Sequence, residues 1–435
     1  MKITIPISLG VLHVWAAHGA KAEGGFLSLP LTRQIASSPT SASSAIGPDS
    51  IGYLVDVDVG TPKQRLQLAV DIGGYGARVV GFCGRHRNTD SECEKRGAYT
   101  ASLSSTSVYV AEGGYVPEED SNPRYWEDGY YYYADDLTIA AQGTLDNVTF
   151  FAWNSSKAYK HGYLGLGPGN RGSNPYATGI LDGLASQGLI ESRAFGVTFD
   201  GSLDAESLVL GGVDSKKFSG ALARVPVVDA PPEATPWEQD KYWLSVNSAT
   251  LDSGNGSRTA VDGFTVIAQG DMVNTLLPID IVEPMLEALS LDWPYGNWRV
   301  VPCSRKDEVN GSLELEFSGF TASIAYADLL APRMGPDAKE GECYITVEPW
   351  DYKGRTPWRL GSAFLRSVYA VFDQDNEAVW LAKRADCGSE LVAFSKGEDV
   401  RGQCDGSESG ETSSGGGGSP NNDGSGSGGN IFSLS

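Results

Sequence analysis

Alternation of apolar and polar residues is the feature that most limits the fold of this chain. The segment Tyr53-Leu-Val-Asp-Val-Asp-Val59 has an aromatic or β-branched residue at every second position, and Leu66-Gln-Leu-Ala-Val70 continues the pattern after a Gly-Thr-Pro turn. A period of two is typical of a half-buried β-strand. Helical periodicity is confined to residues 180–189 and 279–289, the latter after Pro278. We therefore predict a mostly-β protein with few short helices.

The length and charge of the chain limit its class. Its 435 residues can bury a large core and suggest two or three compact units, and its formal net charge is −22. A chain this acidic repels phosphates, so we expect no nucleic-acid partner. The 4 histidines are scattered, and the sequence has neither a Cys-x-x-Cys pair nor a Gly-Lys-Ser/Thr loop. We therefore expect no metal, no cofactor and no nucleotide site.

Both ends of the chain have the composition of processing or linker segments. Residues 1–22 carry a charged start, an apolar stretch and a small-x-small site at Ala20-Lys-Ala22, which predicts a secretory signal peptide. No other stretch is apolar enough to span a bilayer, so we expect a secreted, extracellular protein and a monomer. Residues 23–50, rich in Ser, Ala and Pro, predict a flexible leader or a first extended strand. Beyond Cys404 the Ser/Gly-rich tail is expected to be disordered.

Cysteines and glycosylation sequons agree with an extracellular setting. An even number of cysteines behind a signal peptide favours disulfides, and six cysteines allow 15 pairings, which the sequence alone leaves open. The six are Cys83, Cys93, Cys303, Cys343, Cys387 and Cys404. Four Asn-x-Ser/Thr sequons predict surface glycosylation at Asn147, Asn154, Asn255 and Asn310.

Several motifs in a fixed order give the chain a resemblance to a known family. Val70-Asp-Ile-Gly-Gly74 follows the alternating strand and its Gly-Thr-Pro-Lys-Gln64 turn, and Ile267-Ala-Gln-Gly-Asp271 occupies the matching place in the second half. Ser207-Leu-Val-Leu-Gly-Gly-Val-Asp214 and the stretch 360–373 follow the same order. Over residues 51–382 the chain resembles the pepsin-like aspartic proteases.

The resemblance implies a bilobed fold of two related β-rich lobes around a central cleft. We expect an N-terminal lobe over residues 51–224, a C-terminal lobe over 225–386, and a tail over 387–435 that is closed by a disulfide and then disordered. Among the possible pairings we choose the nearest in sequence, of which the first two resemble one family pair per lobe. These pairs are Cys83–Cys93, Cys303–Cys343 and Cys387–Cys404.

The catalytic positions depart from the family. Aspartic proteases activate water between two carboxylates that share one proton. Asp71 is the first carboxylate, but the second position reads Gln269, which has an apolar strand before it and Leu-Pro nine residues later. Two other carboxylates stay open as the second aspartate: Asp252, in a Leu-Asp-Ser-Gly sequence that also reads as a hairpin tip, and Asp271, by a local slip.

Neighbouring positions depart as well. Ile72 replaces a threonine whose hydroxyl joins the two loops in the family, while Gly73 is kept and Gly270 stands after Gln269. The next residues, 74–78, read Gly-Tyr-Gly-Ala-Arg, where the family usually has Ser-Ser-x-x-Trp. The apolar support behind the first aspartate is therefore expected to differ.

The segment that matches the family's flap also differs. Trp126 replaces the flap tyrosine in our alignment, although Tyr125 is adjacent. The tyrosines at 130–133 either form an aromatic binding surface or simply pack a β-hairpin.

These departures favour a secreted, non-catalytic homologue that binds a peptide or protein in its cleft. One alternative is an active aspartic endopeptidase that uses Asp71 with Asp271 or Asp252. Another is an inhibitor or binder of glycoside hydrolases or carbohydrate, a role that some relatives of the family have.

Overall fold

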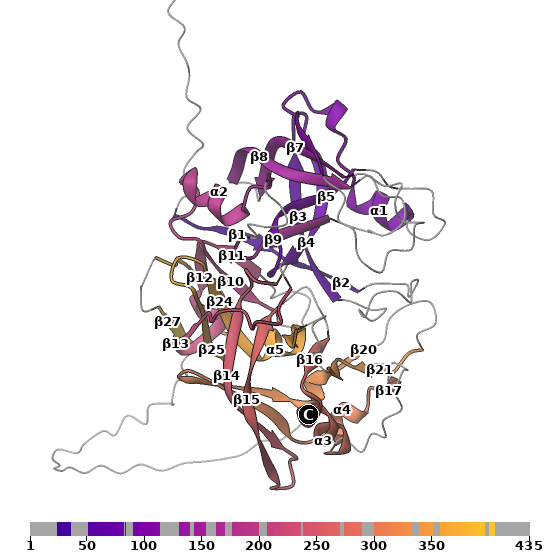
Figure 1. The fold of residues 1–435 in the computed structure, drawn as a ribbon, viewed down its shortest axis with the longest axis vertical. Helices are drawn as coiled ribbons and strands as arrows, with labels where there is room; N and C mark the ends of the chain where they lie inside the picture. Colours follow the sequence, from indigo (N-terminus) through magenta and orange to yellow (C-terminus); the bar gives the residue numbers. More distant parts are fainter. Residues whose placement is uncertain are drawn as a thin grey trace, which may run out of the picture. The chain divides into compact units, whose positions relative to one another are not determined.

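The fold is that of a mostly-β protein whose strands form three large sheets (Figure 1). The computed structural model describes residues 24–35, 51–81, 83, 90–113, 130–139, 143–153, 162–169, 176–199, 207–235, 238–269, 274–288, 300–332, 339–350, 357–395 and 400–404. The predicted signal peptide and the tail beyond Cys404 lie outside these residues. Within the described residues, no helix is both long and apolar enough to cross a membrane.

An eight-stranded sheet makes up the first lobe, in the order β2-β3-β4-β9-β5-β8-β7-β6. The alternation seen in the sequence becomes β3 and β4, whose inward side chains Val55, Val57, Leu66 and Leu68 are buried. The strands are β2 (Thr32–Ile35), β3 (Ile51–Val59), β4 (Gln64–Asp71), β5 (Tyr75–Val80), β6 (Val108–Glu112), β7 (Tyr130–Ile139), β8 (Gly143–Trp153) and β9 (Gly162–Leu166).

A seven-stranded sheet, in the order β19-β18-β14-β15-β23-β16-β22, makes up most of the second lobe, and a three-stranded sheet, β17-β21-β20, completes it. The strands of the larger sheet are β14 (Trp243–Asp252), β15 (Arg258–Ala268), β16 (Thr275–Leu277), β18 (Ser312–Phe317), β19 (Phe320–Ala325), β22 (Val347–Pro349) and β23 (Arg359–Leu360). Those of the smaller are β17 (Val300–Pro302), β20 (Leu330–Pro332) and β21 (Glu342–Ile345).

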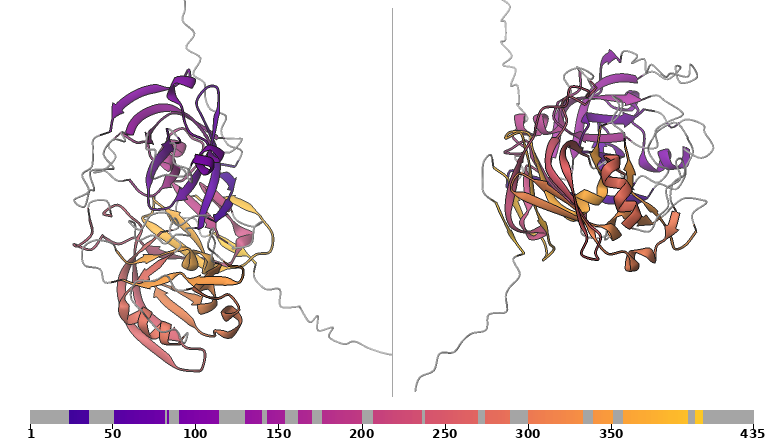
Figure 2. Two further views of the ribbon diagram at one scale, coloured as in Figure 1. Left: turned by 90° about the vertical axis from the view of Figure 1, so that its right-hand side faces the viewer. Right: turned by 60° about the horizontal axis from the view of Figure 1, so that its bottom comes forward.

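A third sheet takes strands from both halves of the sequence, in the order β1-β11-β10-β24-β25-β13-β27. In Figure 2 its yellow C-terminal strands lie beside its magenta strands. Its strands are β1 (Leu27–Pro30), β10 (Ala194–Thr198), β11 (Ser207–Leu210), β13 (Phe218–Pro226), β24 (Val368–Asp373), β25 (Ala378–Arg384) and β27 (Arg401–Gln403), and a separate pair joins β12 (Gly212–Asp214) to β26 (Leu391–Ala393).

The described helices are short. They are α1 (Asp90–Arg96), α2 (Ile180–Ser186), α3 (Ile279–Ala288), α4 (Arg305–Glu308) and α5 (Ser362–Ser367), with single 3₁₀ turns η1 (Ala101–Leu103), η3 (Ser215–Lys217) and η4 (Tyr326–Leu329). The two predicted helical segments correspond to α2 and α3. The prediction of a mostly-β, bilobed fold with few short helices is therefore confirmed.

The expected flexible leader is wrong for residues 27–35. This segment forms β1, which pairs with β11 in the third sheet, and β2, which pairs with β3 in the first lobe. Leu27, Leu29 and Leu31 are 1%, 2% and 7% exposed. Alternate leucines in a strand bury one face, so the alternative of a first extended strand is correct here.

Three disulfides close loops in the described part of the chain. They join Cys83 to Cys93, Cys303 to Cys343 and Cys387 to Cys404, which are the predicted pairs. The first two stay within one half of the sequence each, and the third joins the two ends of the segment that contains β26 and β27.

Candidate functional site

Asp71 ends β4 and is almost fully buried. β4 runs parallel to β9, and Asp71 lies opposite Gly165 in this pair. Asp71 is 5% exposed. One carboxylate oxygen, Oδ1, accepts hydrogen bonds from the backbone N–H groups of Gly73 at 3.1 Å and Gly74 at 2.7 Å. The tight turn after the strand therefore satisfies one oxygen of the retained carboxylate.

Arg78 occupies the other oxygen. Its Nη2 donates to Oδ2 of Asp71 at 2.9 Å, and its guanidinium lies 5.9 Å from the ring of Phe151 and 5.4 Å from that of Tyr163. A planar guanidinium suits both contacts, because it pairs with carboxylates and stacks on aromatic rings. Both Asp71 oxygens are thus engaged by groups of its own lobe.

Gly74 makes this ion pair possible. A Cβ atom at residue 74 would stand 2.0 Å from Oδ2 of Asp71 and 2.4 Å from Nη2 of Arg78. Both distances are far below van der Waals contact. Arg78 can therefore reach Asp71 only because residue 74 has no side chain.

Strand register gives Gln269 the same place in the second lobe as Asp71 has in the first. In the first lobe, β9 lies between β4, to which it is parallel, and β5, to which it is antiparallel. In the second lobe, β23 lies between β15 and β16 in the same way. Val70 pairs with Leu164 just before Asp71, and Ala268 pairs with Leu360 just before Gln269. The backbone N–H of Gln269 also donates to the carbonyl of Leu360 at 3.1 Å. The two loops are topologically equivalent.

The Gln269 side chain is bound by an arginine of its own lobe. Nη1 of Arg359 donates to Oε1 of Gln269 at 2.7 Å, and Nη2 of the same arginine lies 3.5 Å from Oε1 of Glu238. Glu238 in turn accepts hydrogen bonds from Thr235. Arg359 therefore links the carboxylate of Glu238 to the side chain of Gln269.

The two loops approach each other at Gly73. The point where a Cβ on Gly73 would stand is 3.8 Å from Cδ of Gln269 and 3.7 Å from Nζ of Lys241. The ammonium group of Lys241, which precedes β14, donates a hydrogen bond to the carbonyl oxygen of Gly73. Cationic groups of Arg78, Lys241 and Arg359 thus gather around the paired loops.

Asp252 lies far from this site. It ends β14 opposite Arg258 and accepts a hydrogen bond from the N–H of Gly254 at 2.8 Å, in the hairpin tip. Trp243, at the other end of β14, pairs with Ile267 next to the Gln269 loop. Nine residues of strand at about 3.3 Å each separate the two ends by roughly 30 Å. Asp252 therefore cannot share a proton with Asp71.

The remaining predicted site residues lie in the core, on the surface or in parts of the chain outside the described ranges. Ile72, which stands where the family has a threonine, is fully buried, and its side chain packs in the main core. Of the tyrosine run, Tyr132 is buried and packs against Phe151 and Tyr176, as expected for a packed hairpin.

Residues that lie outside the described ranges are Tyr125, Trp126, Asn154, Gly270 and Asp271. The other three sequon asparagines, Asn147, Asn255 and Asn310, are exposed.

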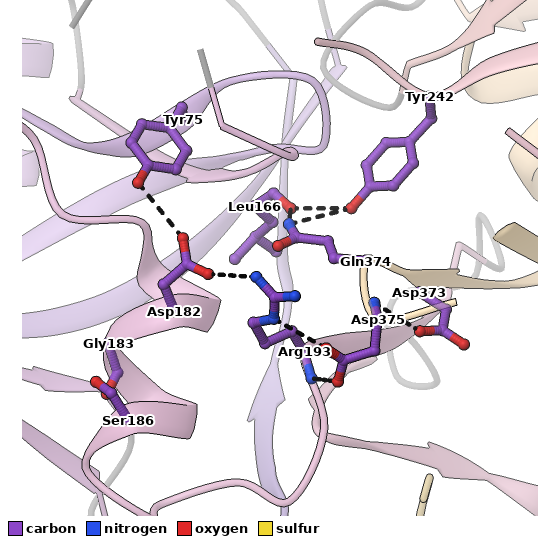
Figure 3. A network of polar contacts seen from close by, with 10 residues as sticks. All are labelled: Tyr75, Leu166, Asp182, Gly183, Ser186, Arg193, Tyr242, Asp373, Gln374 and Asp375. Carbon is purple, nitrogen blue, oxygen red and sulfur yellow. Dashed lines mark hydrogen bonds and ion pairs between the residues drawn. The ribbon is translucent and has the colours of Figure 1, made fainter. Parts of the chain in front are cut away.

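A polar network anchors the Asp71 loop to the third sheet (Figure 3). Arg193, just before β10, joins Asp182 of α2 at 2.8 Å and Asp375 at 3.0 Å. Asp182 also accepts a bond from the hydroxyl of Tyr75, which begins β5, at 3.4 Å. Burial and the charge of Asp182 raise the pKa of Tyr75, which keeps its hydroxyl protonated as a donor.

A second contact in the same view holds β9. Nε2 of Gln374 donates to the carbonyl of Leu166 at 3.0 Å, and the hydroxyl of Tyr242 donates to the same carbonyl at 3.3 Å. The next residue, Gly167, donates its N–H to the carbonyl of Gly74 at 2.7 Å. The loop around Asp71 is therefore fixed by contacts that reach both lobes.

Sequence reasoning missed three of these groups. No role was predicted for Lys241, Glu238 or Arg359, which reach the two loops from the segment before β14 and from β23. Arg78 was visible as an arginine in place of the family tryptophan, but its contact with Asp71 was not foreseen. No sequence pattern indicated this contact, because it depends on the space left by the missing Cβ at Gly74, the residue directly before β5.

Comparison with known proteins agrees with the fold and the order of the motifs. The family model for eukaryotic aspartyl protease matches residues 52–384. The chain is 25% identical to a probable aspartic-type endopeptidase opsB of Aspergillus oryzae, over 76% of this chain and 68% of that protein. It is 28% identical to an acid protease of Saccharomycopsis fibuligera (76% and 80%) and 24% identical to secreted aspartic protease 1 of Candida albicans (87% and 95%). The chain is a member of the eukaryotic aspartyl protease family.

Proposed function

We propose that this chain is a secreted aspartyl protease homologue that binds a peptide or protein segment in its cleft without hydrolysing it. One observation carries the proposal: Asp71, the retained carboxylate, is ion-paired with Arg78, and its counterpart in the second loop is Gln269. In this function the chain still binds peptides, the ligand class of the family, but does not hydrolyse them. Secretion is part of the proposal, supported by the three disulfides and by the relative named as secreted.

The chemistry of the family needs two interchangeable carboxyl groups. One must be ionised to take a proton from water, and the other must be neutral to donate to the scissile carbonyl. A glutamine amide neither gains nor loses a proton in this range. In addition, both oxygens of Asp71 already accept hydrogen bonds, from two backbone N–H groups and Arg78. The ion pair with Arg78 also stabilises the charged form of Asp71, which opposes its taking a proton from water.

The groups around the loops suit binding rather than turnover. Lys241 and Arg359 are hydrogen-bond donors that Gly73 and Gln269 hold at the two loops. Together with Arg78 they make three cations among the described residues there, beside the two carboxylates of Asp71 and Glu238. Backbone carbonyls and carboxylates of a peptide are acceptors for such donors. We also propose that Asn147, Asn255 and Asn310, which are exposed, carry glycans along with Asn154.

The proposal is tested by incubating the purified protein with a defined set of synthetic peptides at pH 4. Mass spectrometry then gives the masses of the peptides that stay bound to the protein. We expect a subset to be retained and recovered at full length, with affinity reduced at least tenfold by the double variant Lys241→Met/Arg359→Met. Lys339→Met, outside the loops, serves as the matched control and should bind normally. Shortened peptides would contradict the absence of hydrolysis, and retention of none would contradict the binding role.

A further inference from the structure

A partly buried carboxyl group and a buried amide meet at the edge of the second-lobe loop. Asn274 lies five residues after Gln269 and directly before β16. Glu348 lies in β22, which runs parallel to β16, with Leu276 opposite Glu348. The pair therefore joins the chain that leaves the Gln269 loop to the neighbouring strand.

The two side chains make one hydrogen bond and leave one buried acceptor unused. Nδ2 of Asn274 donates to Oε1 of Glu348 at 2.6 Å, and Asn274 is 5% exposed. Oδ1 of Asn274 is buried and has no hydrogen-bond partner among the described residues. A buried polar atom without a partner is destabilising, by an amount comparable to a lost hydrogen bond.

A protonated Glu348 offers the hydrogen-bond donor that Oδ1 of Asn274 lacks. A carboxylic acid can accept from an amide N–H and donate its own O–H to the amide oxygen, so that the two groups close a ring of two hydrogen bonds. An ionised carboxylate has no proton to donate, and it would place a negative charge beside the oxygen of Asn274. The orphaned Oδ1 is thus the acceptor that a neutral Glu348 requires.

We propose that Glu348 and Asn274 form a proton-operated latch, closed when Glu348 is neutral and released when it ionises, which fixes β16 and the end of the Gln269 loop to β22. The latch acts on the second loop whether or not the cleft retains any catalytic activity. It is therefore independent of the function proposed above.

The surroundings of Glu348 agree with a neutral carboxyl group. Burial raises the pKa of Glu348 to about 7, and the hydrogen bond from Asn274 opposes this rise. Helix α3 packs against β22, and its carboxylates Asp280, Glu283 and Glu287 are exposed. β16 carries no charged residue, and Arg359, on the strand beyond it, is held by Gln269 and Glu238.

The direction of the pH effect follows from the raised pKa. Between the ordinary glutamate pKa of 4.5 and the raised value of about 7, the closed latch binds a proton that the open latch releases. The latch therefore contributes its full stabilisation below pH 4.5 and loses it as the pH rises through 7. Opening of the latch should become about 70-fold more frequent from pH 5 to pH 8 by this linkage.

Hydrogen exchange measures this opening at two amides. The N–H of Thr275 donates to the carbonyl of Thr346 at 2.7 Å, and that of Trp350 to the carbonyl of Leu277 at 2.8 Å, so both report on the β16–β22 contact. After correction for intrinsic exchange rates, their protection should fall about 70-fold from pH 5 to pH 8 in the unmodified protein. In Glu348→Gln, whose amide can close the same ring at any pH, protection should stay constant. Glu283→Gln, an exposed glutamate on α3, is the matched control and should behave as the unmodified protein.

Two results would overturn the latch. One is a fall in protection with pH in Glu348→Gln equal to that of the unmodified protein. The other needs no variant: the carboxyl carbon of Glu348, followed by NMR, would titrate near 4.5 instead of near 7. If Glu348→Gln does not fold, this titration alone decides.

Discussion

Replacing Arg78 with leucine is expected to lower the free energy of unfolding by about 3 kcal/mol. The change leaves the carboxylate of Asp71, which is 5% exposed, with hydrogen bonds from two backbone N–H groups and no cation. Removal of one partner of a buried ion pair is destabilising by about 3–5 kcal/mol, and the lower end applies because the Arg78 side chain is 26% exposed. Urea unfolding near pH 7 measures the difference.

A surface ion pair supplies the control. Arg65 pairs with Asp56 at 2.6 Å, but both side chains are well exposed, and Arg65→Leu should leave stability almost unchanged. The double variant Asp71→Leu/Arg78→Leu should recover part of the loss seen with Arg78→Leu, because no buried charge remains unpaired. Equal effects of the two single arginine variants would contradict the structural role of Arg78.

Replacing Gly74 with alanine is expected to be at least as destabilising as the loss of Arg78, at about 3 kcal/mol or more. The added methyl group would lie 2.0 Å from Oδ2 of Asp71, so the carboxylate or Arg78 must move and the ion pair must break. Overpacking of a buried site adds about 1–3 kcal/mol of its own. Thermal and urea unfolding give the magnitude.

Gly169→Ala is the control for the glycine itself. A Cβ at Gly169 would meet its nearest atom, in the ring of Tyr75, at 3.5 Å, which is an ordinary contact. Because Gly74→Ala and Arg78→Leu disrupt the same ion pair, the double variant should lose clearly less stability than the sum of the two. Simple additivity would mean that Gly74 does not act through Arg78.

The spacing of apolar residues within a segment was enough to predict several strands and helices. The alternation in residues 53–59 and 66–70 became β3 and β4, and the apolar periodicity after Pro278 became α3. Nearest-in-sequence cysteines met because each pair closes a loop within one half of the chain. The order of the motifs was enough for the family.

Long-range strand pairing decided what the sequence could not. Leu251-Asp-Ser-Gly254 has the family's letters, but the register of β14 with β15 places it at the far tip of a hairpin. Residues 27–30 and 32–35 lie in a segment that is rich in Ser, Ala and Pro, and they form strands because they pair with β11 and β3 respectively. Arg78 reaches Asp71 because of a missing Cβ at Gly74, a fact about space that no spacing rule contains.

Turnover of a denatured protein substrate from about pH 3 to 6, the range in which a shared-proton carboxylate pair works, tests the central claim most directly. The unmodified protein, its Asp71→Asn variant and an active member of the family are compared, each with and without pepstatin. We expect the active enzyme to cleave and pepstatin to stop it, while the unmodified protein shows no more cleavage than Asp71→Asn. Pepstatin-sensitive cleavage by the unmodified protein that disappears in Asp71→Asn would contradict the account.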